Sequence, residues 1–313
     1  MDSAEIQALA QALIHQHGAA FGAQLHNNAN SVELTPQPVP PALRGEPAYL
    51  AALEACSALG FIAVDAETLA QAWQLQSERT NQFDVTHWPD EPRDFGLSGA
   101  DPAQAFAHCP RNLGLYGVLP TAEWVGRMAR AGVPTVQLRF KSDDKAAVAR
   151  EIKAAVEAVE GTGAHLFIND HWQAALDAGA YGIHVGQEDL DVIGHRDLET
   201  IRTSGTRFGV STHGYAEMVR AHAVQPSYIA LGAVFPTTLK KMATAPQGLA
   251  RLAAYVRLMK QYPLVAIGGI SEDMFPAVRA TGVGSVAVVR ALVNAPDPEA
   301  AAKHLLERMQ AAA

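Results

Sequence analysis

Short apolar runs alternate with amphipathic, alanine-rich segments from Leu113 to the C-terminus. Eight runs of strand length occur, within residues 113–119, 135–141, 165–170, 182–187, 207–212, 228–235, 263–270 and 285–292. The segments between most of them, such as TAEWVGRMARAG and LARLAAYVRLMKQ, carry apolar residues at helical spacing. Neighbouring parallel strands need a crossover connection, which a helix usually provides. The pattern therefore predicts eight parallel strands that alternate with helices.

Eight strand–helix units favour a closed (β/α)8 barrel, the TIM-barrel fold, over an open doubly wound sheet. Residues 111–313 give roughly 200 residues, near the lower limit for such a barrel. No GxGxxG follows the first predicted strand, so the fingerprint of a dinucleotide-binding fold is missing. We therefore expect an α/β fold in which residues 111–313 form one barrel domain.

Residues 1–110 do not share this strand series. The segments AYLAALEACSALG and DAETLAQAWQLQSERT have helical spacing, and two or three helices are expected. The stretch 33–47 is rich in proline and is expected to be extended, while 87–102 has the composition of a loop or linker. We predict a mostly helical N-terminal extension, residues 1–110, of unknown function. Its removal is expected to leave the chemistry of the barrel in place.

Composition and charge narrow the classes of partner. Apolar residues make up 49% of the chain and charged residues 18%, which is enough for a sizeable core. A net charge of −8 argues against nucleic acid as a partner. Two cysteines without metal-binding spacing indicate a reduced, cytoplasmic protein. The sequence has no signal peptide and no apolar run of membrane length, so no membrane partner is expected, and it leaves the oligomeric state open.

The end of the second predicted strand, TVQLRFK, carries two cations. Because side chains alternate along a strand, Gln137, Arg139 and Lys141 share one face. In a barrel the apolar face meets the helices, so this polar face should point toward the axis, where an unpaired charge is unfavourable. Two explanations remain open: an anionic ligand, or an internal ion pair with acidic residues of neighbouring strands.

Carboxylates follow the third and fourth predicted strands. Asn169 and Asp170 end one strand, and Asp189 follows the next. Acidic side chains at adjacent strand ends, beside cations, are typical of a Mg²⁺ site that is completed by substrate phosphates. The alternative for Asn169 and Asp170 is helix capping, since Asn and Asp commonly accept backbone N–H groups at a helix start. The alternative for Asp189 is a loop or N-cap residue.

The remaining strand ends carry groups that suit phosphate. They are Ser211, Thr212, His213, Thr237, Thr238, Lys240, Gly268, Gly269, Val289 and Arg290. Loops after strands seven and eight commonly bind phosphate in TIM barrels. We expect two anion sites in one mouth: a metal-chelated diphosphate between strands two, three, four and six, and a monophosphate at strands seven and eight.

Six blocks of this sequence also resemble the thiamine-phosphate synthase family. They are TVQLRFK, LFINDHWQAALDAGAYGIHVGQEDL, GVSTH, YIALGAVFPTTLKKMATAPQGL, VAIGGI and GVGSVAVV, and the resemblance runs from about Leu113 to the C-terminus. It implies an enzyme, a transferase of thiamine biosynthesis. The implied reaction joins a methyl-pyrimidine diphosphate to a thiazole phosphate by dissociative displacement and releases pyrophosphate.

The resemblance also implies roles for individual residues. The pyrimidine diphosphate would be held by the stretch Gln137, Leu138, Arg139, Phe140 and Lys141, together with Asn169, Ser211 and Lys240. Among these, Arg139, Lys141, Ser211 and Lys240 would be catalytic. Mg²⁺ would be bound by Asp170 and Asp189. The thiazole phosphate would be surrounded by Thr237, Thr238, Leu239, Gly269, Val289 and Arg290. His213 is interpreted as a structural residue rather than as an acid or base.

Three positions depart from the family pattern. Leu239 replaces a usual Thr, Arg290 replaces a frequent Ser, and Gly117 stands where Pro is common. Arg290 either supplies charge in place of the missing hydroxyl or alters specificity. Two alternatives to the synthase stay open: a thiazole tautomerase-like barrel and a catalytically silent ligand-binding protein. The extension lies outside the resemblance, and is interpreted as a degenerate remnant or a structural and interaction segment.

Overall fold

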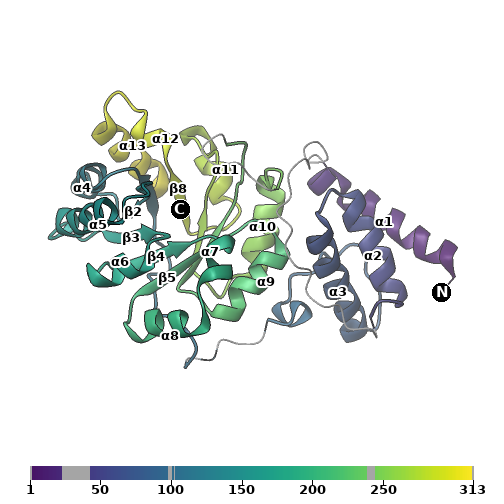
Figure 1. The fold of residues 1–313 in the computed structure, drawn as a ribbon. Helices are drawn as coiled ribbons and strands as arrows, with labels where there is room; N and C mark the ends of the chain where they lie inside the picture. The colour runs from purple at the N-terminus through teal and green to yellow at the C-terminus, as the bar shows by residue number, and fades with distance from the viewer. Residues whose placement is uncertain (1, 23–42, 98–100, 102, 238–243, 312–313) are drawn as a thin grey trace.

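The computed structural model describes residues 2–22, 43–97, 101, 103–237 and 244–311. Eight parallel strands pair in sequence order and close into a barrel, as the sequence predicted (Figure 1). They are β1 (Leu115–Leu119), β2 (Thr135–Leu138), β3 (His165–Asn169), β4 (Gly182–Val185), β5 (Arg207–Thr212), β6 (Tyr228–Leu231), β7 (Leu264–Ala266) and β8 (Ser285–Val288). Most strands are shorter than the apolar runs that predicted them, because the last residues of those runs form the loops at the mouth.

Helices surround the barrel and provide the crossovers. They are α4 (Ala122–Arg130), α5 (Lys145–Val159), α6 (Trp172–Asp177), α7 (Gln187–Val192), α8 (His195–Thr203), α9 (Tyr215–Val224), α10 (Gly248–Leu258), η3 (Glu272–Met274), α11 (Phe275–Arg279), α12 (Arg290–Val293) and α13 (Pro298–Ala311). Among the described residues, none of the helices has the length and apolar character needed to cross a bilayer.

The barrel interior is filled by aromatic side chains rather than left open. Tyr116, Phe167 and Tyr228 form its centre, in a small core separate from the larger core under the helices. Two strand glycines make room for them: a Cβ at Gly182 would lie 2.3 Å from the Phe167 ring, and one at Gly209 would lie 2.1 Å from the Tyr228 ring. The lower barrel is therefore a packed core, and the open space lies above it.

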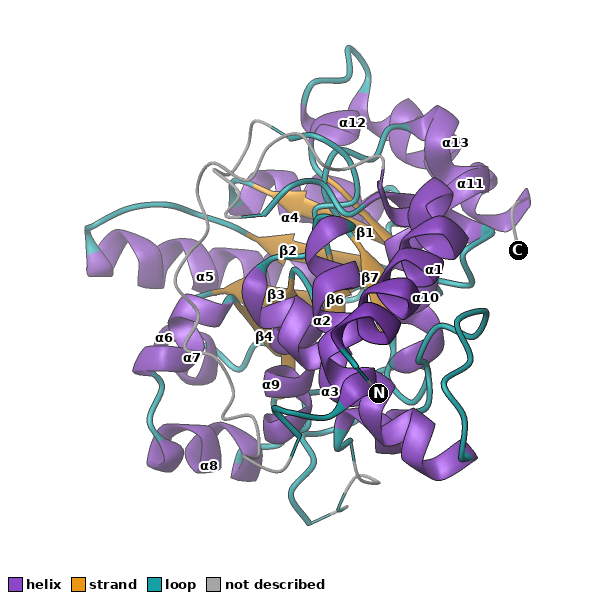
Figure 2. Ribbon diagram, turned by 90° about the vertical axis from the view of Figure 1, so that its right-hand side faces the viewer, coloured by secondary structure: helices purple, strands orange, loops and turns teal. Residues whose placement is uncertain are grey.

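The N-terminal extension is helical, as expected. It contains α1 (Ser3–Phe21), α2 (Pro47–Ala58), α3 (Ala63–Thr80) and the short turn η2 (Pro92–Phe95). Figure 2 shows these helices lying over the α9 and α10 side of the barrel. Most of the stretch 33–47, which we expected to be extended, lies outside the described residues. The stretch 87–97 has no α-helix or strand, but Trp88 and Phe95 in it are buried.

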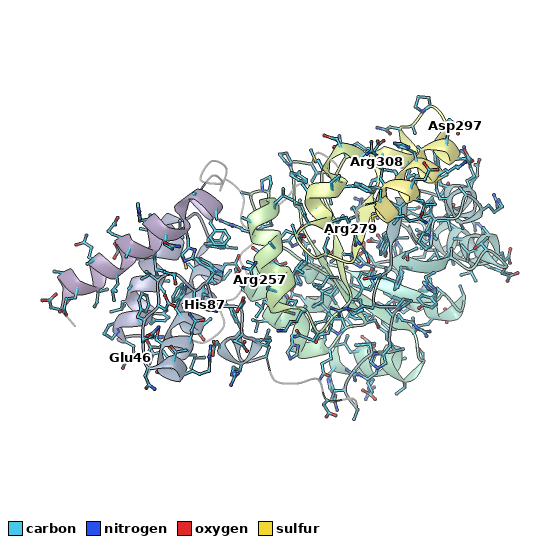
Figure 3. All side chains as sticks on the ribbon, turned by 180° about the vertical axis from the view of Figure 1, so that it is seen from behind. Glu46, His87, Arg257, Arg279, Asp297 and Arg308 are labelled. Atoms are coloured by element: carbon cyan, nitrogen blue, oxygen red, sulfur yellow. The ribbon has the colours of Figure 1, made fainter. Side chains whose placement is uncertain are left out.

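The extension and the barrel share one apolar core. The Trp88 indole donates to the Tyr215 hydroxyl at 2.9 Å, and the Phe95 ring stacks on Tyr215. On α10, Arg257 pairs with Asp90 at 3.3 Å, and Figure 3 labels Arg257 beside the extension. The division of the chain near residue 110 stays a prediction, since the buried cluster runs across it without a break.

Candidate active site

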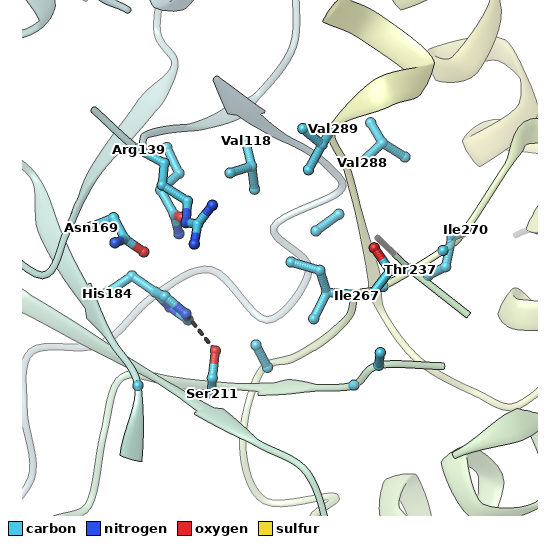
Figure 4. A pocket seen from close by; sticks show the side chains of 18 of the residues that line it. Val118, Arg139, Asn169, His184, Ser211, Thr237, Ile267, Ile270, Val288 and Val289 are labelled. Atoms are coloured by element: carbon cyan, nitrogen blue, oxygen red, sulfur yellow. Dashed lines mark hydrogen bonds between the residues drawn. The ribbon is translucent and has the colours of Figure 1, made fainter. Parts of the chain in front are cut away.

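A cavity of about 960 Å³ occupies the C-terminal mouth of the barrel (Figure 4). Its lining draws on residues at or just beyond the ends of all eight strands, as expected for this fold. Many of the residues singled out in the sequence line it together: Gln137, Arg139, Lys141, Asn169, Asp170, Asp189, Ser211, Thr212, His213, Thr237, Gly268, Gly269, Val289 and Arg290. The strand alternation thus brought cations and carboxylates into one hollow.

Two residues of the predicted substrate-binding stretch have side chains elsewhere. Leu138 is buried in the outer core, and Phe140 packs against that core. Both belong to the face that points away from the axis, so any contact from them to a substrate would come from the backbone. Thr238, Leu239 and Lys240 lie outside the described residues.

Asp170 stands at the end of β3 in an unusual backbone conformation. Its φ of 64° is in the left-handed region, which Asp tolerates better than most residues, and its N–H donates to the His184 carbonyl at 2.9 Å. Helix α6 begins after His171 and has no side-chain cap. The capping interpretation is therefore wrong for Asn169 and Asp170, and both side chains line the cavity instead.

Asp189 has two roles at once. It lies in the first turn of α7, where its Oδ2 accepts the Gly186 N–H at 2.8 Å. The N-cap residue is Gly186, so Asp189 is neither a loop nor an N-cap residue, although its side chain does bond to the helix start. It also lines the cavity close to Asp170. Burial and the neighbouring Asp189 carboxylate raise the pKa of Asp170 to about 6, and Arg139 opposes this rise. A divalent cation would relieve the repulsion between the two carboxylates.

Two carboxylates alone are a partial metal site. Among the described residues, no cluster of three or more His, Cys, Asp or Glu side chains is arranged to hold a metal ion. Mg²⁺ commonly uses one or two carboxylates and takes its other ligands from water and substrate phosphates. Asp170 and Asp189 fit that chemistry, which couples metal binding to a phosphorylated substrate.

The cations at the end of β2 have no salt bridge within the described part of the chain. Arg139 is half-buried and Lys141 is exposed, and both face the cavity. Of the two explanations that the sequence left open, this arrangement favours an anionic ligand over an internal ion pair. The nearby Asp170 keeps a long-range electrostatic interaction with Arg139.

A chain of hydrogen bonds crosses the floor of the cavity. Gln137 Nε2 donates to Tyr116 Oη at 3.0 Å, which lies 2.8 Å from Tyr228 Oη. His184 continues the chain, with Nδ1 at 2.6 Å from Tyr228 Oη and Nε2 at 2.8 Å from Ser211 Oγ. Five strands each contribute one member, so the chain fixes the relative positions of Gln137 and Ser211.

Sequence reasoning missed three of these five residues. His184, Tyr116 and Tyr228 all lie on inward faces, in runs that are mostly apolar. The alternation that placed Gln137 and Arg139 inward applies equally to His184 in GIHV, and that signal would have found it.

The opposite wall of the cavity is mostly apolar. Figure 4 shows Ile267, Ile270, Val288 and Val289 on this side, with Thr237 among them, facing Arg139, Asn169 and Ser211 across the space. Exposed Arg290 begins α12 at the rim.

Gly269 lets two loops meet at this wall. Its φ of 67° is left-handed, and a Cβ there would lie 2.5 Å from the Pro236 carbonyl oxygen. The close approach of the β7 loop to the β6 loop therefore requires glycine.

Glu217 holds both the ring and the backbone of His213 at the cavity wall. Glu217 Oε2 lies 2.7 Å from His213 Nδ1 and also accepts the His213 N–H at 2.8 Å. This contact fixes the orientation of the ring, and the interpretation of His213 as a structural residue stays a prediction.

Known proteins resemble the barrel part of the chain. The family model described as thiamine monophosphate synthase matches residues 117–292. A thiamine-phosphate synthase of Neisseria meningitidis is 53% identical over 191 residues, which cover 61% of this chain and 92% of that protein. One of Cronobacter sakazakii is also 53% identical, over 64% of this chain and 95% of that protein.

A solved structure agrees with these sequence matches. The thiamine phosphate pyrophosphorylase from Pyrococcus furiosus superposes with a TM-score of 0.58 and 28% identity, over 64% of this chain and 98% of that chain. The N-terminal extension is additional to these relatives. The chain therefore belongs to the thiamine monophosphate synthase family, and it is an enzyme, a transferase that forms thiamine phosphate.

Proposed function

We propose that the polar wall of the cavity binds the pyrimidine diphosphate and that the opposite wall binds the thiazole phosphate. The observation that carries this assignment is the shared hollow of Arg139, Lys141, Asp170 and Asp189. Two cations that have no salt bridge to any described residue, together with two carboxylates across from them, suit a diphosphate that arrives with a divalent cation. Lys240, outside the described residues, is proposed to complete the diphosphate site.

The reaction follows from where charge develops. The C–O bond between the pyrimidine methylene and the diphosphate breaks, and its electron pair leaves with pyrophosphate. The thiazole nitrogen then donates its lone pair to the methylene carbon and forms the new C–N bond. Because negative charge grows on the leaving group, the cations Arg139 and Lys141 beside it would stabilise the transition state more than the ground state.

Asp170 and Asp189 are proposed to hold Mg²⁺. When bound, this ion would neutralise charge on the leaving diphosphate. The residues themselves perform the orienting work. Asn169 and Gln137 offer amide groups to the pyrimidine substrate, and Ser211, held by His184, offers its hydroxyl. Fixed positions matter here, since alignment of two bound reactants supplies much of the rate.

The thiazole phosphate is assigned to the second wall. Ile267 and Val289 give an apolar surface for the ring, while the backbone around Gly269, after β7, lies where a phosphate is commonly bound in TIM barrels. Thr237 of the β6 loop lines the same cavity. Arg290 at the rim adds a cation. We propose that this arginine compensates for the family hydroxyl that Leu239 lacks.

The test is a reconstitution with purified full-length protein, both substrates and Mg²⁺. Pyrophosphate and thiamine phosphate should appear in equal amounts, and omission of either substrate should abolish both. Isomerised thiazole without pyrophosphate would instead identify a tautomerase, and saturable binding without turnover a silent binding protein. Either of these two results would overturn the proposal.

A further inference from the structure

We propose that Asp65, a residue of the N-terminal extension, is a positioning residue for the active site. It caps helix α9 of the barrel and so holds residues 213–214, the turn that joins the end of β5, with Ser211, to this helix. The inference rests on the proposed function, in which Ser211 contacts the pyrimidine substrate. It makes the extension a working part of the catalytic domain.

Helix α9 has no cap of its own. Its N-cap residue is Gly214, which lacks a side chain to accept the free N–H groups of the first turn. The carboxylate of Asp65 takes this place, since its Oδ1 accepts the Ala216 N–H at 2.9 Å. A Cβ on Gly214 would lie 2.0 Å from Asp65 Oδ2. With φ at 177°, Gly214 is in extended backbone that any residue adopts, so what glycine provides here is space for Asp65.

The first turn of α9 is joined directly to the cavity. Glu217 in this turn holds both the backbone and the ring of His213, and Glu217, His213 and Ser211 all line the cavity. Ser211 in turn is hydrogen-bonded to His184. A shift of the α9 start would therefore move residues 211–213, which carry one part of the polar wall.

The burial of Asp65 argues for a specific role. Its residue surface is only 3% exposed, and an isolated buried carboxylate is unfavourable. The neighbouring Glu217 repels the charge of Asp65. The N-terminus of α9 and the guanidinium of Arg251 stabilise that charge, and this guanidinium lies 3.8 Å over the Phe61 ring. An apolar side chain would attach the extension to the barrel at least as firmly. What a carboxylate adds is the cap.

The experiment is a rescue. Asp65→Ala should lower kcat/KM for the pyrimidine diphosphate by about tenfold, through a higher KM, a lower kcat or both. Small displacements of positioned groups reduce rates by up to about 100-fold. The KM for the thiazole phosphate should stay unchanged. Gly214→Ser, a good N-cap residue, should restore activity when added to Asp65→Ala. The same substitution in the wild-type chain should reduce activity, because the new Cβ meets the Asp65 carboxylate.

Asp94→Ala is the matched control. Asp94 is also buried, but it pairs with Arg79 inside the extension at 2.6 Å. Its loss should lower the melting temperature without changing either KM. If Asp65→Ala behaves in the same way, or if Gly214→Ser fails to rescue it, the positioning role is overturned.

A second readout does not depend on activity. Hydrogen exchange of the peptide that spans residues 211–217 should be faster in Asp65→Ala than in Asp94→Ala, since only the former frees the α9 N–H groups. Equal exchange in the two variants would overturn the proposal even if the wild-type enzyme made no thiamine phosphate. Should Asp65→Ala not fold, Asp65→Asn keeps an acceptor oxygen and is expected to retain both slow exchange and activity.

Discussion

The barrel and the N-terminal extension place their charged side chains differently. In the extension, Arg79 pairs with the buried Asp94, and the His17 ring bonds to the Val85 carbonyl. At the mouth of the barrel, Arg139 and Lys141 face a cavity with no salt bridge inside the described chain. The difference indicates that charged side chains that line a cavity without an ion pair are available for a ligand, while ion-paired side chains stabilise the fold.

Asp65 stands between these two classes. It is satisfied, like the polar groups of the extension, but its partner is a helix of the barrel that begins at the active site. The comparison therefore predicts that substitutions at the mouth change catalysis, that substitutions in the extension change stability, and that those along the shared boundary change both.

The largest effect is expected from Phe61→Ala. Phe61 is buried against Phe21, Trp88, Tyr215 and Arg251, so its truncation should lower the free energy of unfolding by about 3–5 kcal/mol. Because the core is shared, denaturation followed by fluorescence should show one transition at lower denaturant. Two separate transitions, with the barrel unchanged, would show that the parts fold independently. Phe83→Ala, whose ring contacts Trp73 inside the extension, is the control.

Asp170→Ala should separate catalysis from stability. Loss of a metal ligand should reduce turnover on the order of 100-fold, equivalent to about 3 kcal/mol of transition-state stabilisation. Its melting temperature should fall only slightly: the side chain is exposed at the open mouth, and the remaining cost is that Ala tolerates the left-handed backbone of residue 170 less well than Asp. Pyrophosphate release titrated with Mg²⁺ measures the effect. A wild-type Mg²⁺ dependence would refute the metal assignment, and Asp191→Ala, on the same rim but paired with Arg220, is the control.

Arg290→Ser should have a smaller, selective effect. An exposed cation that binds a phosphate contributes modestly, so the KM for the thiazole phosphate should rise by about three- to tenfold. The KM for the pyrimidine diphosphate should not change, because its proposed site lies on the other wall. Equal KM values for the thiazole in both proteins would show that Arg290 points elsewhere. Arg308→Ser, at an exposed pair with Glu272, is the matched control.

The smallest effect concerns pH. Burial, followed by Glu217, raises the pKa of Asp65 from 3.8 to about 7, and the Ala216 and Tyr215 N–H groups together with Arg251 oppose the rise. The folded chain thus keeps this proton to higher pH than the unfolded chain. The contribution of this proton to the free energy of unfolding is fully present below about pH 4 and is lost as the pH rises toward 7.

Asp65→Asn should flatten this part of the profile. Its melting temperature should change less between pH 4.5 and pH 7 than that of the wild type, because the amide does not titrate. Parallel profiles would show that Asp65 titrates normally. Asp84→Asn, at a half-buried turn where the carboxylate bonds to Thr86, controls for the loss of one carboxylate.

Local pattern determined much of the barrel. Period-two alternation in TVQLRFK was enough to place Gln137, Arg139 and Lys141 on the inner face, and eight repeated units were enough to predict closure. Capping chemistry alone could not separate Asp170 from Asp189, because both follow strands and precede helices. The structure separated them: the N-cap residue of α6 makes no side-chain cap bond, while Asp189, in the first turn of α7, accepts the N–H of the N-cap residue Gly186.

Tertiary structure decided the contacts between distant segments. Tyr116 and Tyr228 are 112 residues apart and meet only because the barrel closes; Asp65 and Ala216 are 151 residues apart and meet only because the extension docks on α9. The sequence by itself determined which side chains face the axis, since alternation is a property of one strand. Which of those side chains touch each other, and what caps α9, depends on packing between elements, and no local pattern records it.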